Sequence, residues 1–370
     1  MSPAARRARS RGASQSAPKL LLDLLDARGP SGYERAAADV WAKAASRFAE
    51  VGTDVVGTPM ALVAPKRVRG RPARRLLVMG HIDEIGLIVT HIDEQGYLWF
   101  REVGGWDPQI LVGQRIVIDT RGGPVHGVVG RKPIHLLRDE DRKKVAAIRE
   151  MHIDIGARDA EDACARVRVG DVAVIDALPA QLPNGRLAAR ALDNRLGSFV
   201  ALEAARLVAE AGGGAWELAA VAAVQEETTF GGSRTSAFAL KPDAAIVLDV
   251  THATDAPGID VKEAGKHELG SGPVIARGST LSERLFELLH DTAEAEKVPF
   301  TVEATARATG TDADAVHISR GGVPTALVMI PIRYMHSPVE LVQLDDVDAC
   351  ARLVAATALR LDAKASFGAA

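Results

Sequence analysis

The stretch Leu76-Leu77-Val78-Met79-Gly80-His81-Ile82-Asp83 joins a short apolar run to a histidine and a carboxylate. An apolar run of this length, bounded by a turn signal, is typical of a strand buried in a parallel sheet. In open α/β sheets, ligands bind beyond the carboxyl ends of such strands. The stretch therefore predicts a buried strand over 76–79 that presents His81 and Asp83 at a ligand-binding edge.

Three further apolar runs, at 218–224, 244–248 and 326–330, precede polar side chains of the same kinds. The side chains are Glu226 and Glu227 after the first run, Asp249 after the second and His336 beyond the third. Histidine nitrogens together with carboxylate oxygens are the ligands of zinc-type hydrolases that activate water. The four runs together predict a metallohydrolase with its site at one edge of one sheet.

Local geometry suggests roles for two of these pairs. In extended backbone, residues two apart face the same way, so Asp83 is expected to contact the ring of His81. Adjacent residues at a strand end face opposite sides, so one of Glu226 and Glu227 would bind metal while the other faces substrate. The alternative for the glutamates is an ordinary surface loop.

Other polar residues carry a functional and a structural interpretation. Asp193 stands at the entrance of a predicted helix, where it is either a metal ligand or an N-cap. His336 taken alone could be a hydrogen-bonded core histidine. His252 and Asp255 are weaker candidates near Asp249.

A second copy of the motif H-I-D-E occurs at 91–94. It is followed by Gln95-Gly96 and lies between two β-like stretches, which is the composition of a hairpin turn. His91 is therefore predicted to be structural.

The pattern along the chain predicts an α/β fold. Leucines from Lys19 onward indicate a first helix, and the capping-box pattern from Ser31 to Glu34 predicts a second helix to about Phe48. Short β-like stretches fill the next region, and helix–strand alternation then resumes, with helices expected at 194–211, 281–296 and 346–361.

The predicted architecture is a mixed, largely parallel sheet with flanking helices, of the kind seen in zinc peptidases, interrupted by a small β-barrel-like domain. We expect a catalytic domain at 19–84 and 181–362, the inserted domain at 85–180, a disordered tail at 1–18 and a short tail at 363–370.

Composition narrows the class of protein. The chain has 370 residues, of which 47% are hydrophobic, and a net charge of -3, which gives no electrostatic case for binding nucleic acid or a membrane surface. No apolar run reaches the roughly 18 residues of a membrane span. The Arg- and Ser-rich start lacks the apolar stretch of a signal peptide. Because the two cysteines, Cys164 and Cys350, form no disulfide or metal motif, they are expected to be ordinary buried thiols in a reducing cytoplasm.

Six segments taken in order resemble the TET-type metallo-aminopeptidases, which include glutamyl and deblocking aminopeptidases and proteins labelled endoglucanase M or cellulase. The segments are H-I-D-E-I-G-L-I-V from 81, A-L-D-N-R-L-G from 191, V-Q-E-E-T from 224, L-D-V-T-H-A-T-D-A-P-G from 248, G-T-D-A from 310 and I-P-I-R-Y-M-H-S-P from 330.

The resemblance implies roles for the candidate residues. His81, Asp193 and Asp249 would bind one metal ion, and Asp193 would bridge to a second ion held by Glu227 and His336. Glu226 would be the general base, and Asp83 would orient His81. The ions would be zinc, cobalt or manganese, and the substrates would be short peptides with a free amino terminus, cleaved inside a tetrahedral shell of twelve subunits.

Two departures from the family pattern stand next to the site. The family often has E-E-V-G-L-R-G-A where this chain has E-E-T-T-F-G-G-S from Glu226, and it often has a second aspartate where this chain has Asn194. A neutral residue at 194 should not remove a ligand if Asp193 is the bridge.

Two alternatives to an aminopeptidase remain. The first is another dinuclear metallohydrolase, such as a carboxypeptidase, a deacylase of N-acyl amino acids or an endoglucanase. The second is a scaffold without activity.

Overall fold

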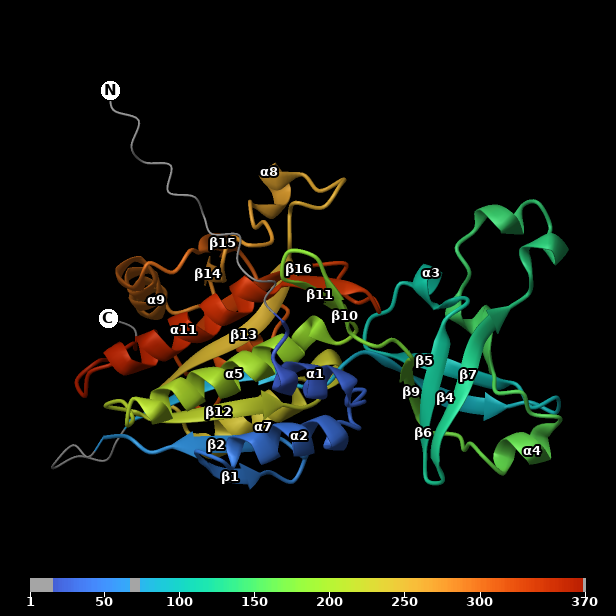
Figure 1. Cartoon of the computed structure of the whole chain (residues 1–370), viewed down its shortest axis with the longest axis horizontal. Coiled ribbons are helices and arrows are strands. Elements are labelled where there is room, and N and C mark those ends of the chain that lie inside the picture. Colours follow the sequence, from blue (N-terminus) through green and yellow to red (C-terminus); the bar gives the residue numbers. More distant parts are fainter. Residues whose placement is uncertain (1–15, 67–73, 369–370) are drawn as a thin grey trace.

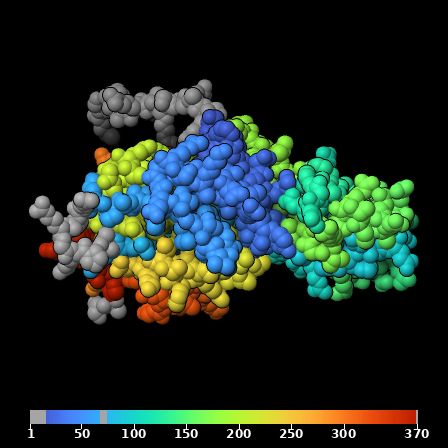
Figure 2. Space-filling view, turned by 90° about the horizontal axis from the view of Figure 1, so that it is seen from below, coloured from blue at the N-terminus to red at the C-terminus, as the bar shows by residue number. Residues whose placement is uncertain are grey.

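The computed structural model describes residues 16–66 and 74–368, so most of the predicted tail at 1–18 lies outside the described residues. The chain forms two parts (Figure 1). A large sheet with helices occupies one side, and a six-stranded barrel stands beside it. The space-filling view shows the barrel as a separate lobe (Figure 2).

The large sheet is mixed, and its centre is parallel. The strands run in the order β1-β2-β12-β3-β13-β16-β17-β11-β10, with β14 beside β16 and β15 beside β14. Parallel pairs join β12 to β3, β3 to β13 and β13 to β16, whereas the strands toward both ends of this order pair antiparallel. Strand β14 is antiparallel to β16, and β15 is parallel to β14. The bounds are β1 Glu50–Thr53, β2 Pro59–Val63, β3 Arg75–His81, β10 Ala180–Leu182, β11 Arg186–Ala189, β12 Glu217–Ala223, β13 Ala244–His252, β14 Val274–Gly278, β15 Thr301–Thr305, β16 Thr325–Arg333 and β17 Glu340–Gln343.

Side chains alternate between the two faces of this sheet. On β13, Ile246 and Leu248 join the larger core cluster, whereas Ala245 and Val247 join the smaller cluster on the opposite face. Because both faces are covered, each central strand contains a continuous apolar run, as expected for buried parallel strands. The sequence predicted these runs correctly.

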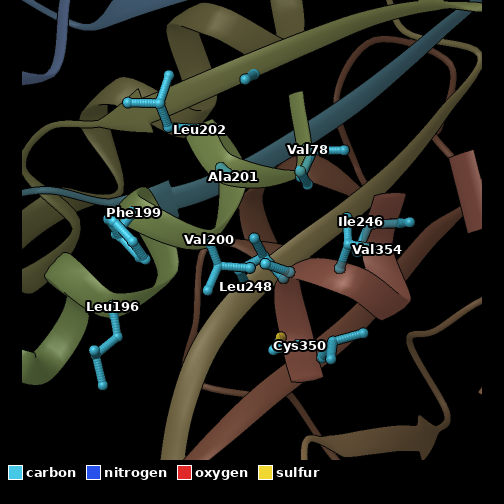
Figure 3. Close-up of a cluster of buried hydrophobic side chains, with 14 of the residues drawn as sticks. Val78, Leu196, Phe199, Val200, Ala201, Leu202, Ile246, Leu248, Cys350 and Val354 are labelled. Atoms are coloured by element: carbon cyan, nitrogen blue, oxygen red, sulfur yellow. The ribbon is translucent and has the colours of Figure 1, made fainter. Parts of the chain in front are cut away.

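Helices cover both faces. The larger cluster packs against α5 and α11, and Figure 3 shows Val200 and Val354 of these helices close to Leu248 and Ile246 of the sheet. The smaller cluster includes Ala237 of α7. The helix bounds are α1 Lys19–Asp26, α2 Arg35–Ala45, α5 Leu192–Glu210, α6 Glu226–Thr229, α7 Gly231–Leu240, α8 Val261–Ala264, α9 Glu283–Glu296, α10 Ala313–Val316 and α11 Leu344–Arg360. The three long helices predicted after residue 190 are present within two residues of the expected ends.

The predicted capping box is wrong. Helix α2 begins at Arg35, after Glu34, and no side chain caps its amino end. Glu34 Oε1 instead accepts hydrogen bonds from the backbone N–H groups of Gly32 and Gln225, and the Ser31 hydroxyl is paired with Thr228 Oγ1. Ser31 and Glu34 therefore hold the segment before α2 against the segment that follows β12, instead of capping the helix.

The barrel confirms the predicted region of short strands. Its strands close in the order β4-β5-β8-β7-β6-β9, and all neighbours are antiparallel. The bounds are β4 Gly86–Ile92, β5 Leu98–Val103, β6 Arg115–Thr120, β7 Gly123–Arg131, β8 Met151–Asp154 and β9 Val172–Ile175, with short helices α3 Pro108–Leu111 and α4 Ala160–Cys164 and single turns at Ile134–Leu136, Asp141–Lys143 and Ile148–Glu150. A third core cluster, centred on Leu98 and Ile153, fills the interior.

Within the described ranges, no helix combines the length and apolar character that a membrane crossing requires. Cys164 and Cys350 are both free thiols, but only Cys350 is buried, so the expectation that both are buried is wrong for the exposed Cys164. Near the carboxyl end, Phe367 packs edge-on against Trp216, with ring centroids 6.0 Å apart, so this segment is attached to the main core.

Candidate metal centre

The predicted ligands converge at the carboxyl ends of the central parallel strands. His81 is the last residue of β3, and Asp249 lies within β13, its neighbour. Glu226 follows β12, on the other side of β3, and His336 follows β16. The arrangement is that of ligand sites in open α/β sheets.

Asp193 is contacted from two sides. Its Oδ1 lies 3.2 Å from His81 Nε2, and its Oδ2 lies 3.3 Å from His336 Nε2. Asp193 is in the first turn of α5, where its backbone is not helical, and Ala191 rather than Asp193 is the N-cap residue. The N-cap interpretation of Asp193 is therefore wrong, and its carboxylate faces both histidines.

Two groups of possible ligands share Asp193. The first comprises His81, Asp193 and Asp249, and the second comprises Asp193, Glu227 and His336. In each group the ligand atoms lie within 4.8 Å of one another. The Nε2 atoms of His81 and His336 lie 4.0 Å from Asp249 and 3.7 Å from Glu227, respectively.

The sequence predicted that Glu226 and Glu227 lie at a strand end, and this prediction is wrong. Strand β12 ends at Ala223, and Glu226 and Glu227 open the short helix α6. They still point to different places: Glu226 Oε2 lies 3.6 Å from His81 Nε2, whereas Glu227 is near His336. Gln225, whose backbone adopts the left-handed conformation, makes the turn from β12 to α6.

Asp83 does more than orient a histidine. Its Oδ1 lies 3.3 Å from Nδ1 of the buried His81 ring. The same carboxylate accepts hydrogen bonds from the backbone N–H groups of Glu226 and Glu227, at 3.1 and 3.0 Å. Asp83 therefore fixes one histidine and the backbone that carries both glutamates.

The sequence interpretation missed Glu340, which is 2% exposed. Its Oε1 accepts a hydrogen bond from the backbone N–H of His336 at 2.9 Å, and its Oε2 accepts one from that of Asp193 at 3.0 Å. The segment from 330 to 338 drew attention to His336, but nothing in the sequence indicated that the glutamate four residues further on, at the start of β17, turns back to the same site.

The barrel side of the chain also contributes to the site. The carbonyl of Gly105, just after β5, accepts a hydrogen bond from His336 Nδ1 at 2.8 Å. This bond leaves Nε2 of His336 free to face Asp193 and Glu227. The orientation of the His336 ring thus depends on a residue 231 positions away.

The departure at position 194 has a structural explanation. The Asn194 side chain donates a hydrogen bond to the carbonyl of Leu248 at 2.8 Å and accepts one from the backbone N–H of Gly197 at 2.8 Å. Asn194 therefore ties the start of α5 to the strand residue before Asp249. Asn194 belongs to neither of the two groups of possible ligands.

The remaining candidates lie outside the two groups. His91 is exposed in the β4–β5 hairpin, and Asp93 accepts the hydrogen bonds of that turn. Asp255 is paired with Arg333, with a 3.0 Å bond to Nε, and is structural. His252 is exposed at the end of β13 and lines the cavity beside the two groups of possible ligands.

The electrostatics of this site favour the binding of positive charge. Burial, with a contribution from Asp249, raises the pKa of Glu226 to about 10, although His81 opposes the shift. Burial and Asp193 raise the pKa of Glu227 to about 8, and burial raises that of Asp249 well above its ordinary value. Carboxylates gathered without cations resist ionisation, and bound cations remove that penalty. Because the donor set is histidine nitrogen and carboxylate oxygen, these residues fit divalent ions such as zinc.

The fold and the site together define a class: a metal-dependent hydrolase built on a mixed α/β sheet with an adjoining barrel. The family model described as M42 glutamyl aminopeptidase matches residues 62–353. The chain belongs to this family, and it is an aminopeptidase, a hydrolase of peptide bonds that depends on divalent metal ions.

Individual relatives agree with this assignment. The chain is 35% identical to lysyl aminopeptidase of Pyrococcus furiosus, over 91% of this chain and 95% of the relative. Among solved structures, it is 36% identical to a TET aminopeptidase from a marine sediment archaeon of the Thaumarchaeota, with a TM-score of 0.87 and coverage of 93% and 96%. It is 30% identical to the TET1 peptidase of Pyrococcus horikoshii, with a TM-score of 0.81 and coverage of 93% and 99%.

Replacing Glu340 tests its positioning role. In Glu340→Ala the backbone N–H groups of Asp193 and His336 lose their acceptor, so we expect divalent-metal affinity to fall by about 10- to 100-fold. Glu340→Gln keeps one acceptor and should fall less. Competition with a fluorescent zinc chelator measures the affinity, and an unchanged value in Glu340→Ala would contradict the role.

Proposed function

We propose that this aminopeptidase uses two divalent ions per chain, one in each ligand group, with Asp193 as the shared ligand. The observation that carries the proposal is the placement of the two Asp193 oxygens, each facing a different histidine at 3.2 and 3.3 Å. His81 and Asp249 would complete one site, and Glu227 and His336 the other. Nitrogen and oxygen ligands without cysteine suit zinc, cobalt or manganese.

Bound ions would acidify a water molecule and stabilise charge on the carbonyl oxygen of the scissile bond. In the proposed mechanism Glu226 accepts a proton from the attacking water and passes it to the leaving amine. Its position supports this role, since its carboxylate lies 3.6 Å from His81 Nε2 and could share a cation with His81 and Glu227, but it is not grouped with Asp193, the proposed shared ligand. Asp83 acts as a positioning residue, because it holds the backbone of Glu226 and the ring of His81.

We propose short peptides with a free amino terminus as substrates. The ligands line a cavity of about 520 Å³, which is large enough for one or a few residues. A free α-amine would be received among the carboxylates of this cavity. N-acetylated copies of the same peptides would resist cleavage.

We also propose that the chain assembles into a closed homo-oligomer of twelve subunits. The TET1 peptidase of Pyrococcus horikoshii assembles into a tetrahedron or a large octahedral shell, and the fold of the present chain follows that structure over 93% of its length. Closed symmetric assembly limits growth and can enclose active sites.

A cytoplasmic location fits the thiols. Cys164 is exposed and Cys350 is buried, and neither forms a disulfide. Unpaired cysteines are usual where glutathione and thioredoxin keep thiols reduced. We propose the cytoplasm as the site of action, which detection of the enzyme in fractionated cells would test.

Replacing the proposed base should separate chemistry from metal binding. In Glu226→Gln, the side chain keeps its size but cannot accept a proton, so kcat should fall at least about a hundredfold while metal content is unchanged. Kinetics with aminoacyl p-nitroanilides and elemental analysis of the same preparation measure both. Near-normal kcat would contradict the assignment.

Metal titration tests the two-ion proposal. Chelator-treated enzyme should lose activity and regain it with zinc, cobalt or manganese, and binding should saturate at two ions per chain. His81→Ala and His336→Ala should each lower the stoichiometry by removing one ligand group, whereas Asp193→Ala should weaken both sites. Saturation at one ion per chain would overturn the proposal.

Light scattering tests the assembly. The mass should be near twelve times the 39.1 kDa of one chain. A monomer or dimer at micromolar concentration would reject the shell, without affecting the proposed chemistry at the metal centre.

A further inference from the structure

The cavity beside the metal ligands continues along strand β13. Thr251 lies two residues beyond Asp249, so their side chains leave the same face of the strand, about 6.5 Å apart. The Thr251 hydroxyl donates a hydrogen bond to Glu303 Oε2 at 2.9 Å. Glu303, which belongs to β15, therefore brings a carboxylate into the cavity one step beyond a metal ligand.

This carboxylate is accessible from the cavity. The Glu303 side chain is 31% exposed, unlike Asp249, whose side chain is 8% exposed. Only Oε2 of Glu303 is engaged by hydrogen bonds in the described part of the chain, through Thr251. Glu303 also lies outside both ligand groups, so its charge is not needed to hold an ion.

The surroundings do not neutralise Glu303. The nearest basic ring is that of His267, whose Nε2 lies 3.9 Å from Glu303 Oε2 and whose Nδ1 is 2.7 Å from the Thr301 hydroxyl. Burial lowers the pKa of His267, against the opposing effect of Glu303, so the ring is neutral near pH 7. Among the residues that the structure describes, no lysine or arginine lines the cavity.

Apolar side chains line the same cavity between the polar groups. Met329 is directly opposite Asp249 in the register of β16 with β13, and Met335 and Phe230 line the cavity as well. Methionine side chains adapt to flexible aliphatic chains. A side chain with an apolar stem and a cationic head matches this combination of methionines and an accessible carboxylate.

We propose that this cavity selects peptides whose amino-terminal residue is lysine or arginine, with Glu303 as the residue that binds the cationic head. The inference rests on the proposed function, since the scissile bond must lie at the metal ligands. An acidic terminal side chain would be repelled by the same carboxylate, and a neutral one would leave its charge without an opposite charge nearby.

The test compares Lys-, Arg-, Met- and Glu-p-nitroanilide with the metal-loaded, full-length enzyme. Methionine has nearly the length of lysine without its charge, so the ratio of kcat/KM for Lys over Met isolates the contribution of charge. We expect this ratio to be at least ten, with Glu-p-nitroanilide the poorest substrate. In Glu303→Gln, which can still accept the bond from Thr251, the ratio should fall at least tenfold.

Glu263→Gln is the matched control, because it removes the same charge from an exposed position on α8 that does not line the cavity. It should leave the ratio unchanged. Activity with a Lys-to-Met ratio near one, a preference for Glu, or an unchanged ratio in Glu303→Gln would overturn the inference while leaving the aminopeptidase mechanism intact. Absence of turnover on all four substrates would overturn the proposed function as well.

Discussion

The structure of the site depends on one shared carboxylate. Asp193 contacts His81 through one oxygen and His336 through the other, so it links strand β3 to the loop after β16. The carboxylate of Asp193 can contact both histidines only if its own backbone and the rings of His81 and His336 are held in place. Glu340 fixes the backbone of Asp193 and of His336, Asp83 lies against the ring of His81, and Gly105 fixes the ring of His336. These supporting contacts are as much part of the site as the ligand atoms.

The supports also couple the two parts of the molecule. The bond from His336 Nδ1 to Gly105 joins the end of the large sheet to the segment that leaves barrel strand β5. Elsewhere Arg28 donates a 2.8 Å hydrogen bond to Asp119 of barrel strand β6. Displacing the barrel would therefore disturb a ligand as well as an interface. The barrel thus contributes to the geometry of the centre even though neither ligand group contains a barrel residue.

Charge explains why these supports are needed. Six carboxylates surround two histidines in a largely buried space, from Asp83, Asp193, Glu226, Glu227, Asp249 and Glu340. Burial raises the pKa of four of them, whereas the hydrogen bonds from His336 and His81 outweigh burial at Asp193 and lower its pKa. Without fixed geometry such groups would separate or take up protons. Bound cations and a rigid backbone together make the arrangement stable.

The sequence by itself determined the central sheet, since strand segments buried on both faces must be apolar, and it placed five candidate residues at or after the ends of those apolar segments: His81, Glu226, Glu227, Asp249 and His336. It could not decide which way Asp193 faces, that α6 begins at Glu226, or that Glu340 supports the centre. These features arise from contacts between segments far apart in the chain, 147 residues for Asp193 with Glu340. The predicted capping box failed for the same reason, because Glu34 is engaged by Gln225, 191 residues away, rather than by its own helix. Only the folded chain brings such partners together.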